Sequence, residues 1–232
     1  TLQGGLGDDR LLGGSGLDVA VLSGLRAATL FARNADGTVT ATGPDGTDTL
    51  SGIELARFAD GSTKRLQVAP ADYDGDGRSD ILWRNDDGTL VTWRMNGAAS
   101  TGGGGIAVVD PVWQVAGSAD LTGDGRADIL WRNTASGETV LWQMNGTAVT
   151  TSFGLGAVPL AWQIEAVAAS DGAGASEIVW RHTDGSVVIW TLQGGVSTGS
   201  AFLGAPDPSW AIVGTGDFFD DGNTSLLWRN AV

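Results

Sequence analysis

The segment that decides the fold reads Asp80-Ile81-Leu82-Trp83-Arg84-Asn85, and close copies of it return three times along the chain. The copies occupy residues 128–133, 177–182 and 225–230, so the leading tryptophan recurs after 48, 49 and 48 residues. A fixed period of this length is the signature of a repeat architecture, in which each repeat forms one small unit of secondary structure. The chain is therefore organised as repeats.

Each repeat carries the signals of short antiparallel strands. The Trp83 segment and its copies are followed by a turn, an alternating apolar stretch, a second turn and a glycine-rich stretch that leads to Trp113, Trp162 or Trp210. Period-two alternation interrupted by regular turn residues indicates β-strands. Four strands in about 48 residues is the size of one β-propeller blade. The 37 glycines also disfavour a helical fold, because helix interiors reject glycine.

We therefore predict an all-β protein that ends in four-stranded antiparallel blades of the β-propeller type. The blades number three full repeats and a half, with boundaries at 67–114, 115–164, 165–212 and 213–232 (partial). Three blades are too few for a closed ring of the usual roughly four to eight. Residues 27–66, chain beyond this sequence, or a second copy would have to complete the ring, so a homo-oligomer is one of three open alternatives.

Composition excludes several classes of protein. The chain has 27 acidic and 13 basic residues, a net charge of −14, and an acidic surface repels both nucleic acids and anionic membrane surfaces. No apolar stretch is long enough to span a membrane. There is no cysteine and only one histidine, His182, so thiolate zinc sites and histidine-rich metal sites are excluded. We expect no catalytic residues and no enzyme.

The loop before the first tryptophan segment has the spacing of a calcium-binding loop. It offers the carboxylates of Asp72, Asp74, Asp76 and Asp80 and the carbonyl of Arg78 at alternating positions. Calcium takes six to eight oxygen ligands, and carboxylates at this spacing converge on one point. An ordinary aspartate-glycine turn is the alternative, but four carboxylates crowded without a cation would repel one another. The sequence therefore predicts Ca²⁺ here.

The same loop recurs before each later tryptophan segment with a changing set of ligands. The second copy keeps five oxygen donors, namely Asp120, Thr122, Asp124, the carbonyl of Arg126, and Asp128. The third has Ala169 and Ala173 at two of these positions, and the fourth keeps only Asp217 and Asp221 with Phe219 between them. We predict a calcium ion in the second loop and none in the third, whereas the fourth lacks half of its ligands.

These loops and tryptophan segments resemble the FG-GAP or VCBS family of β-propeller blades, over residues 67–232. The resemblance implies blades whose calcium loop joins the first and second strands. It also implies extracellular binding roles, which in this family include lectins and adhesion proteins.

The N-terminal residues carry a different motif. Residues 4–12 and 13–21 both fit the nonapeptide GGxGxDxUx, with Asp9 and Asp18 at position six and apolar residues at position eight. The tandem motif resembles the RTX family, whose parallel β-roll binds Ca²⁺. We therefore predict a β-roll remnant over 1–26, with Asp9 and Asp18 as metal ligands, and a β-rich cap over 27–66. The resemblance implies a secreted or cell-surface bacterial protein exported by a type I system.

Two groups of tryptophans have different expected roles. Residues required by every blade are more often core than ligand platform, so we expect core packing for Trp83, Trp131, Trp180 and Trp228. A second group lies beside the glycine-rich loops and provides the candidate ligand-binding residues, Trp113, Trp162 and Trp210. The arginine that follows each leading tryptophan also recurs, at Arg84, Arg132, Arg181 and Arg229. We expect it to make an ion pair between blades or to stack on tryptophan.

Three functions fit these features. The favoured one is a secreted calcium-dependent binding module for a carbohydrate or another cell-surface ligand. The second is a structural or self-assembling surface protein whose repeats mainly contact other proteins. The third is a non-catalytic C-terminal portion of a type I-secreted hydrolase.

Overall fold

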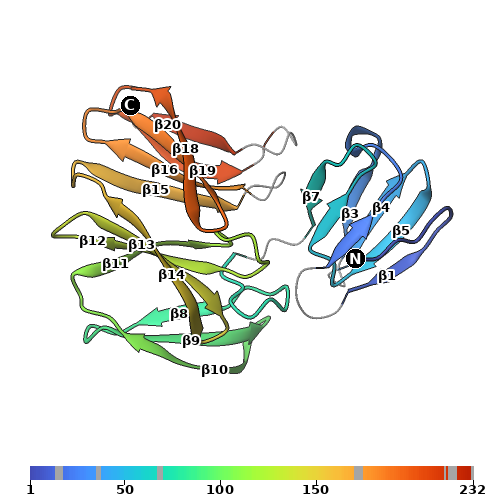
Figure 1. The fold of residues 1–232 in the computed structure, drawn as a ribbon, viewed down its shortest axis with the longest axis horizontal. Coiled ribbons are helices and arrows are strands. Elements are labelled where there is room, and N and C mark those ends of the chain that lie inside the picture. The colour runs from blue at the N-terminus through green and yellow to red at the C-terminus, as the bar shows by residue number, and fades with distance from the viewer. Residues whose placement is uncertain are drawn as a thin grey trace. The chain divides into compact units, whose positions relative to one another are not determined.

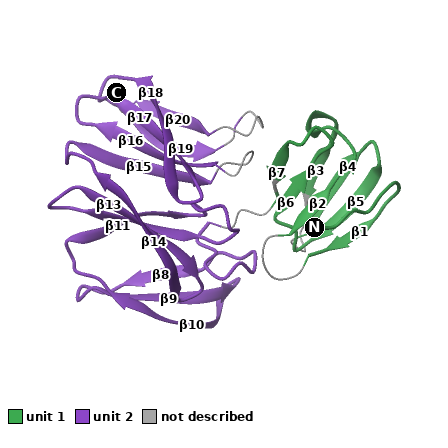
Figure 2. Ribbon diagram, in the orientation of Figure 1, with its two compact units in different colours: residues 1–69, 171–173 green, residues 70–170, 174–232 purple. Residues whose placement is uncertain are grey.

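The computed structural model describes residues 1–13, 18–34, 38–66, 70–169, 175–216, 218 and 224–230. These residues fall into two compact units, one up to residue 66 and one from residue 70 (Figure 2). All of the second predicted calcium loop is described. Residues 170–174 of the third loop, and residues 217 and 219–223 of the fourth, lie outside the described residues.

The second unit consists of antiparallel sheets stacked in chain order, so the predicted all-β fold is confirmed (Figure 1). The sheets have the strand orders β10-β9-β8, β11-β12-β13-β14, β15-β16-β17-β18 and β19-β20. Their strands are β8 (Ile81–Arg84), β9 (Thr89–Asn96), β10 (Ala99–Val108), β11 (Trp113–Ala119), β12 (Asp128–Asn133), β13 (Glu138–Asn145), β14 (Ala148–Ala157), β15 (Trp162–Ala169), β16 (Ala175–His182), β17 (Val187–Gln193), β18 (Val196–Gly204), β19 (Trp210–Gly216) and β20 (Ser225–Asn230).

The second, third and fourth sheets start at Trp113, Trp162 and Trp210, which our sequence boundaries placed at the end of a repeat. Trp113 pairs with Asn133, and Trp162 pairs with His182 in the same way. The physical reason is the antiparallel hydrogen bonding of β11 with β12, which places Trp113 at the start of the second sheet. The first sheet consequently has three described strands and the last has two.

Alternation along the second strand of each sheet assigns its residues to two different interfaces. Ile129 and Trp131 of β12 are buried in a cluster with Leu90 of the first sheet. Leu130, between them, is buried in a cluster with Ile178 of the third sheet. Successive side chains of a strand point to opposite faces, so one strand serves two cores. A strand buried on both faces reads as a continuous apolar run, as the ILW segment does.

The recurring arginines stack on the tryptophan of the next sheet, one of the two roles expected from the sequence. The guanidinium carbon of Arg84 lies 5.4 Å from the ring centre of Trp131, and that of Arg132 lies 5.0 Å from Trp180. The same carbon of Arg181 lies 5.3 Å from the ring of Trp228. A cation over the face of an aromatic ring is attracted by the negative charge of that face. The repeat therefore has a polar as well as an apolar connection between sheets.

The expected burial of the leading tryptophans is correct for three of them and wrong for Trp83. Trp131 and Trp180 are 1% exposed. Trp228 is partly buried and packs against the cluster that Val179, Val187 and Ile189 form in the third sheet. Trp83 is 48% exposed. The reason is positional, because Trp83 lies on the outer face of the first sheet in the stack, where its own unit has no preceding sheet among the described residues.

The first unit combines parallel and antiparallel pairing. Its strands are β1 (Arg10–Leu12), β2 (Val19–Val21), β3 (Leu30–Arg33), β4 (Val39–Gly43), β5 (Gly46–Ser51), β6 (Leu55–Arg57) and β7 (Thr63–Arg65), with a 3-10 turn η1 at Arg26–Ala28. β1 pairs in parallel with β5, and β2 pairs in parallel with β6. β3 and β4, which follow β2 in the sequence, form an antiparallel hairpin, and β4 pairs in turn with β5. The predicted position-eight residues Leu11 and Ala20 are buried in the core of this unit.

Parallel pairing in the first unit also includes an isolated bridge near the N-terminus. Leu2 is bridged in parallel to Ala20, which lies 18 residues later, the length of two nonapeptides. The segment 43–57, which we assigned to a cap, provides the strands that continue the parallel sheets. In the described part of the chain, no helix is long and apolar enough to cross a membrane.

The repeat offers a matched pair of substitutions for its core. Trp131→Ala should lower the free energy of unfolding of the second unit by about 3–5 kcal/mol, because it leaves a cavity at a fully buried site. Trp83→Ala removes the equivalent ring from an exposed site and should cost less than about 1 kcal/mol. Denaturant unfolding followed by tryptophan fluorescence checks both values. Equal losses for the two variants would contradict the assignment of Trp83 to an outer face.

Candidate metal centre

The loop at residues 72–80 is shaped by its own backbone. The N–H groups of Gly75 and Gly77 donate to the two carboxylate oxygens of Asp72, each at 2.8 Å. Both glycines have a positive φ, of 80° and 81°, a conformation that costs glycine little and other residues more. The loop therefore closes around the Asp72 carboxylate, and glycine at these two positions permits the closure.

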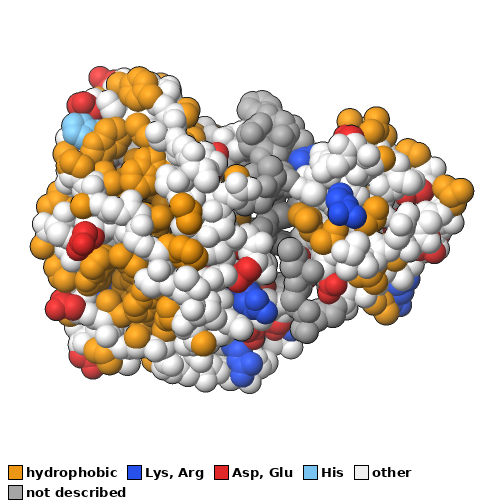
Figure 3. Space-filling model, in the orientation of Figure 1, with side chains coloured by type: hydrophobic (Ala, Val, Ile, Leu, Met, Phe, Trp, Pro, Cys, Tyr) orange, Lys and Arg blue, Asp and Glu red, His pale blue; other side chains and the backbone are white. Residues whose placement is uncertain are grey.

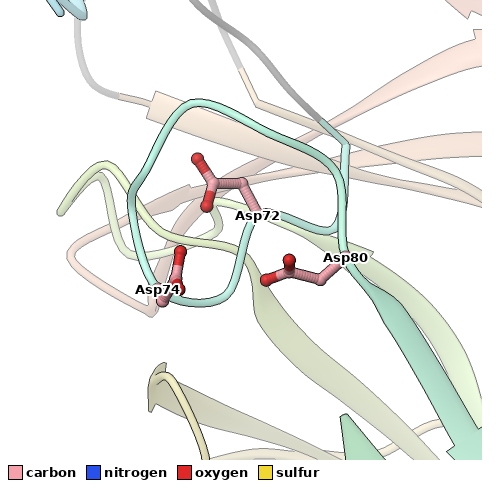
Figure 4. A group of neighbouring side chains, drawn as sticks. All are labelled: Asp72, Asp74 and Asp80. Carbon is pink, nitrogen blue, oxygen red and sulfur yellow. The ribbon is translucent and has the colours of Figure 1, made fainter. Parts of the chain in front are cut away.

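Three of the predicted ligands come together inside this loop. One carboxylate oxygen each from Asp72, Asp74 and Asp80 lie within 4.8 Å of one another, and their side chains face a common space (Figure 4). Asp80 also accepts backbone N–H bonds from Tyr73 and Met95, each at 3.1 Å. These bonds hold its carboxylate in place against the loop.

Asp76, the remaining predicted carboxylate, makes a different contact. Its two oxygens accept hydrogen bonds from the backbone N–H and the guanidinium of Arg78, both at 2.9 Å. The structure thus brings together three of the four carboxylates of the predicted set. The role of Asp76 and of the Arg78 carbonyl as ligands stays a prediction.

The gathered carboxylates are electrostatically unfavourable in their ionised form. Asp72 and Asp80 are each 6% exposed. Burial, helped by the neighbouring charges of Asp76 and Asp74, raises the pKa of Asp72 to about 6 despite the backbone hydrogen bonds that lower it. Burial also raises the pKa of Asp80. Desolvation and like charges both disfavour a carboxylate anion, and a divalent cation among these oxygens would relieve both effects.

The chemistry of the donors fits a hard cation. All three gathered ligands are carboxylate oxygens, the type that Ca²⁺ prefers over nitrogen or sulfur. Among the described residues, the counter-charge to this group is Arg94, whose guanidinium lies 3.7 Å from an oxygen of Asp74. One partly exposed arginine is a weak partner, so the group retains an excess of negative charge that a calcium ion would balance.

The second loop repeats the same backbone cradle. Gly123 and Gly125 donate to the two oxygens of Asp120 at 2.6 and 2.9 Å. Asp128 is fully buried, and burial raises its pKa to about 7. The Thr122 hydroxyl oxygen is buried without a hydrogen-bond partner. An ion in this loop would give that oxygen a partner, so the predicted ligand Thr122 fits the site.

In the first two sheets, a residue of the strand that follows the leading tryptophan strand contacts the acidic loop, a contact that sequence analysis did not foresee. Gln143 donates to Asp124 at 2.9 Å, and Arg94 is the residue at the equivalent place in the first sheet. Arg94 and Gln143 each come directly after the second tryptophan of their repeat, and this shared position in the sequence could have indicated that they contact the loop. Asp124 also lies 4.0 Å from the guanidinium of Arg126, and its counterpart in the first loop, Asp76, lies 2.9 Å from that of Arg78.

The other predicted ligands are not gathered into such a group. Among the described residues, Asp9 and Asp18 share no cluster of three acidic side chains within the same distance. Asp9 donates its backbone N–H to Asp48 at 3.0 Å, and Asp18 donates its own to Glu54 at 2.8 Å. The carboxylates of Asp48 and Glu54 therefore lie beside the backbone of Asp9 and Asp18.

Both loops are anchored to the following sheet. The Tyr73 hydroxyl lies 2.8 Å from the Ser118 hydroxyl, and the backbone carbonyl of Tyr73 accepts the N–H of Gly146 at 2.7 Å. At the equivalent place in the second loop, the carbonyl of Leu121 accepts the Ser176 hydroxyl at 2.7 Å. Tyr73 and Leu121 are themselves buried in the hydrophobic clusters between sheets. The order of each loop is thus coupled to the packing of two sheets.

The acidic loop and the tryptophan segments match a known repeat. Residues 72–131 match the FG-GAP-like repeat family. The match begins at the first ligand of the first loop, ends at Trp131, and so includes both calcium-type loops. In the second sheet, the loop of the FG-GAP-like repeat joins the first strand, β11, to the second, β12, as the resemblance implied.

One solved structure has a similar fold. A chain of the Photorhabdus luminescens Tc holotoxin pore is similar over 89% of this chain and 11% of its own length, with a TM-score of 0.52 and 19% identity. This chain therefore spans about one ninth of that chain. The WD40 domain of SCAP from fission yeast gives a TM-score of 0.28 at 11% identity, over 78% of this chain and 43% of that one. No curated protein matches in sequence.

Two of the three candidate ligand tryptophans, Trp113 and Trp162, line cavities beside the sheets. Trp162 lines a cavity of about 350 Å³ together with Arg132, Thr134 and Gln163. Trp113 lines a smaller apolar cavity of about 140 Å³. Trp210 is 41% exposed. The Trp162 cavity is the one that combines an indole with several polar side chains.

The pKa shifts predict an unusual pH dependence for the ion-free protein. The folded state holds protons on Asp72 and Asp128 up to about pH 6 and 7, whereas an unfolded aspartate releases its proton near pH 4. The folded state therefore binds more protons in this window, so stability in a chelator should fall as pH rises from about 4 to about 7 and then level off. Thermal melts against pH check this, with Asp128→Asn expected to flatten the slope and Asp86→Asn to leave it unchanged.

Calcium should reverse this loss of stability. An ion at 100 times its Kd stabilises a protein by about 2.7 kcal/mol, which for a chain of this size is a rise of roughly 5–10 °C in Tm. Asp74→Asn should reduce the rise, because it removes one gathered ligand and few other contacts. Asp86→Asn, which removes an exposed charge from the nearby β8–β9 turn, is the control. Identical melting curves in calcium and in chelator would contradict the site.

Proposed function

We propose that the chain is a calcium-dependent carbohydrate-binding module of a secreted or cell-surface bacterial protein, without a catalytic role of its own. The observation that carries the proposal is the gathering of Asp72, Asp74 and Asp80 inside a loop that is tied to the next sheet. An ion at this place would order the loop and, through Tyr73, the interface between two sheets.

The extracellular part of the proposal rests on calcium supply and on the first unit. Loops of this type need free calcium at concentrations that are typical outside cells when their ligands are few. The nonapeptides at 4–21 and the 18-residue spacing of the Leu2–Ala20 bridge support an RTX-type roll. Such a roll agrees with export by a type I system, in which calcium outside the cell drives folding.

Carbohydrate is the ligand that the Trp162 cavity fits best. Trp162 provides an aromatic face for stacking on a sugar ring, and the ring of His182 lies 4.9 Å from it. Gln163 and Thr134 provide groups that can both donate and accept hydrogen bonds, as sugar hydroxyls require. The volume, about 350 Å³, lies within the range of small-molecule sites.

A glycan array with calcium-loaded protein tests the proposal. We expect hits for the wild-type chain that disappear in chelator, and a loss of affinity of about tenfold or more for Trp162→Ala, equivalent to about 1.4 kcal/mol, because the substitution removes the aromatic face that would contact the sugar ring. Phe202→Ala is the control, since Phe202 is 66% exposed and lies away from the cavity. Folded, calcium-loaded protein without any hit would reject the carbohydrate assignment.

A further inference from the structure

The two end sheets of the second unit carry exposed faces that are complementary by the rule of the repeat. We define the front face of a sheet as the one that carries the leading tryptophan, and the back face as the one that carries the residue before it. Figure 3 shows hydrophobic side chains gathered in patches over this unit. Contiguous exposed apolar surface on a protein commonly marks an interaction site.

Every internal interface joins a back face to a front face. Leu82 and Leu90 on the back of the first sheet pack with Ile129 and Trp131 on the front of the second. The second and third sheets repeat this arrangement with Leu130 against Trp180, and the third and fourth repeat it again. At each of these three interfaces the arginine of the earlier sheet also stacks on the tryptophan of the later one.

The front face of the first sheet has the residues of this interface without the neighbour. Ile81 is 38% exposed, Trp83 48% and Trp93 45%. Trp83 and Trp93 keep the ring contact of the internal sheets, with centroids 5.0 Å apart, compared with 5.1 Å for Trp131 and Trp142. The surface is therefore already arranged as it is in the buried interfaces, and within the described residues no arginine lies over Trp83.

The back face of the last sheet carries the other half. Leu227 occupies the position of Leu130 and is 51% exposed. Val213 is 50% exposed at the position of Ala116, which packs in the cluster on the back of the second sheet. Arg229 is exposed at the position of Arg132, and the described residues offer it no ring to stack on.

We propose that the front face of the first sheet binds the back face of the last sheet of a second copy of this chain, with Arg229 of one copy stacked on Trp83 of the other. The occupant follows from continuity, because the contact would repeat for a fourth time an interface that the chain already makes three times. The contact is heterologous, so two copies that make it reciprocally close a ring, and copies that do not close form an open row.

Two charge substitutions test the proposal through mixing. Trp83→Glu removes the front face and keeps the back, whereas Leu227→Glu removes the back face and keeps the front. Light scattering over a concentration series should show association of the wild-type chain and monomers for each variant alone. An equimolar mixture should form pairs, because one intact back face then meets one intact front face. Neither variant alters a buried side chain, and circular dichroism verifies that both fold.

Further variants test the arginine and the specificity. Arg229→Ala should weaken association roughly 2- to 30-fold, the range expected for loss of a cation–aromatic contact. Phe202→Glu changes an equally exposed apolar residue of an internal sheet and should associate as the wild type does. A wild-type chain that is monomeric at every concentration would overturn the proposal. So would association of Leu227→Glu alone, which would indicate a contact between two front faces, or a mixture that stays monomeric.

Discussion

The strict alternation of side chains along the second strand of each sheet is the constraint on which the rest of the structure depends. Because both faces of an internal sheet are buried, one strand must supply two different cores at once. Ile129 and Trp131 pack against one neighbouring sheet and Leu130 packs against the other. A shift of the pairing register by one residue would turn each of these side chains to the opposite face. This explains why the repeat keeps the same order of residue types wherever a sheet lies between two others.

The acidic loops depend on the same packing. Tyr73 and Leu121 each stand one residue after the first ligand of their loop, and each is buried between two sheets. A loop that lost its shape would withdraw one of these side chains from the core. Conversely, the sheets hold Asp80 and Asp128 in buried positions where carboxylates are unfavourable without a cation. An ion bound in either loop would thus be linked to folding through a shared side chain rather than through the loop alone.

Much of this could be predicted from the sequence, because a repeated pattern reports local pairing directly. The tryptophan period predicted the sheets, and the loop spacing predicted three carboxylates that do converge. What the sequence could not supply depends on position within the stack. Trp83 and Trp131 have the same local sequence, yet one is exposed and the other buried, since only the neighbouring sheet differs. Likewise, β1 pairs with residues of β5 that are 39 positions later in the sequence, a separation over which local sequence patterns give no signal.

The hairpin of β3 and β4 has a consequence for the order in which the first unit forms. It separates β1 and β2 from their parallel partners in the sequence, so β1 cannot complete its pairing until residue 51 has been made, and β2 cannot until residue 57 has been made. A chain synthesised from its N-terminus must therefore carry two unpaired strands for some time. The hairpin itself closes locally and shortens the loop that remains to be closed. The hairpin thus delays the parallel pairing of β1 and β2, and its closure then brings these strands closer to β5 and β6.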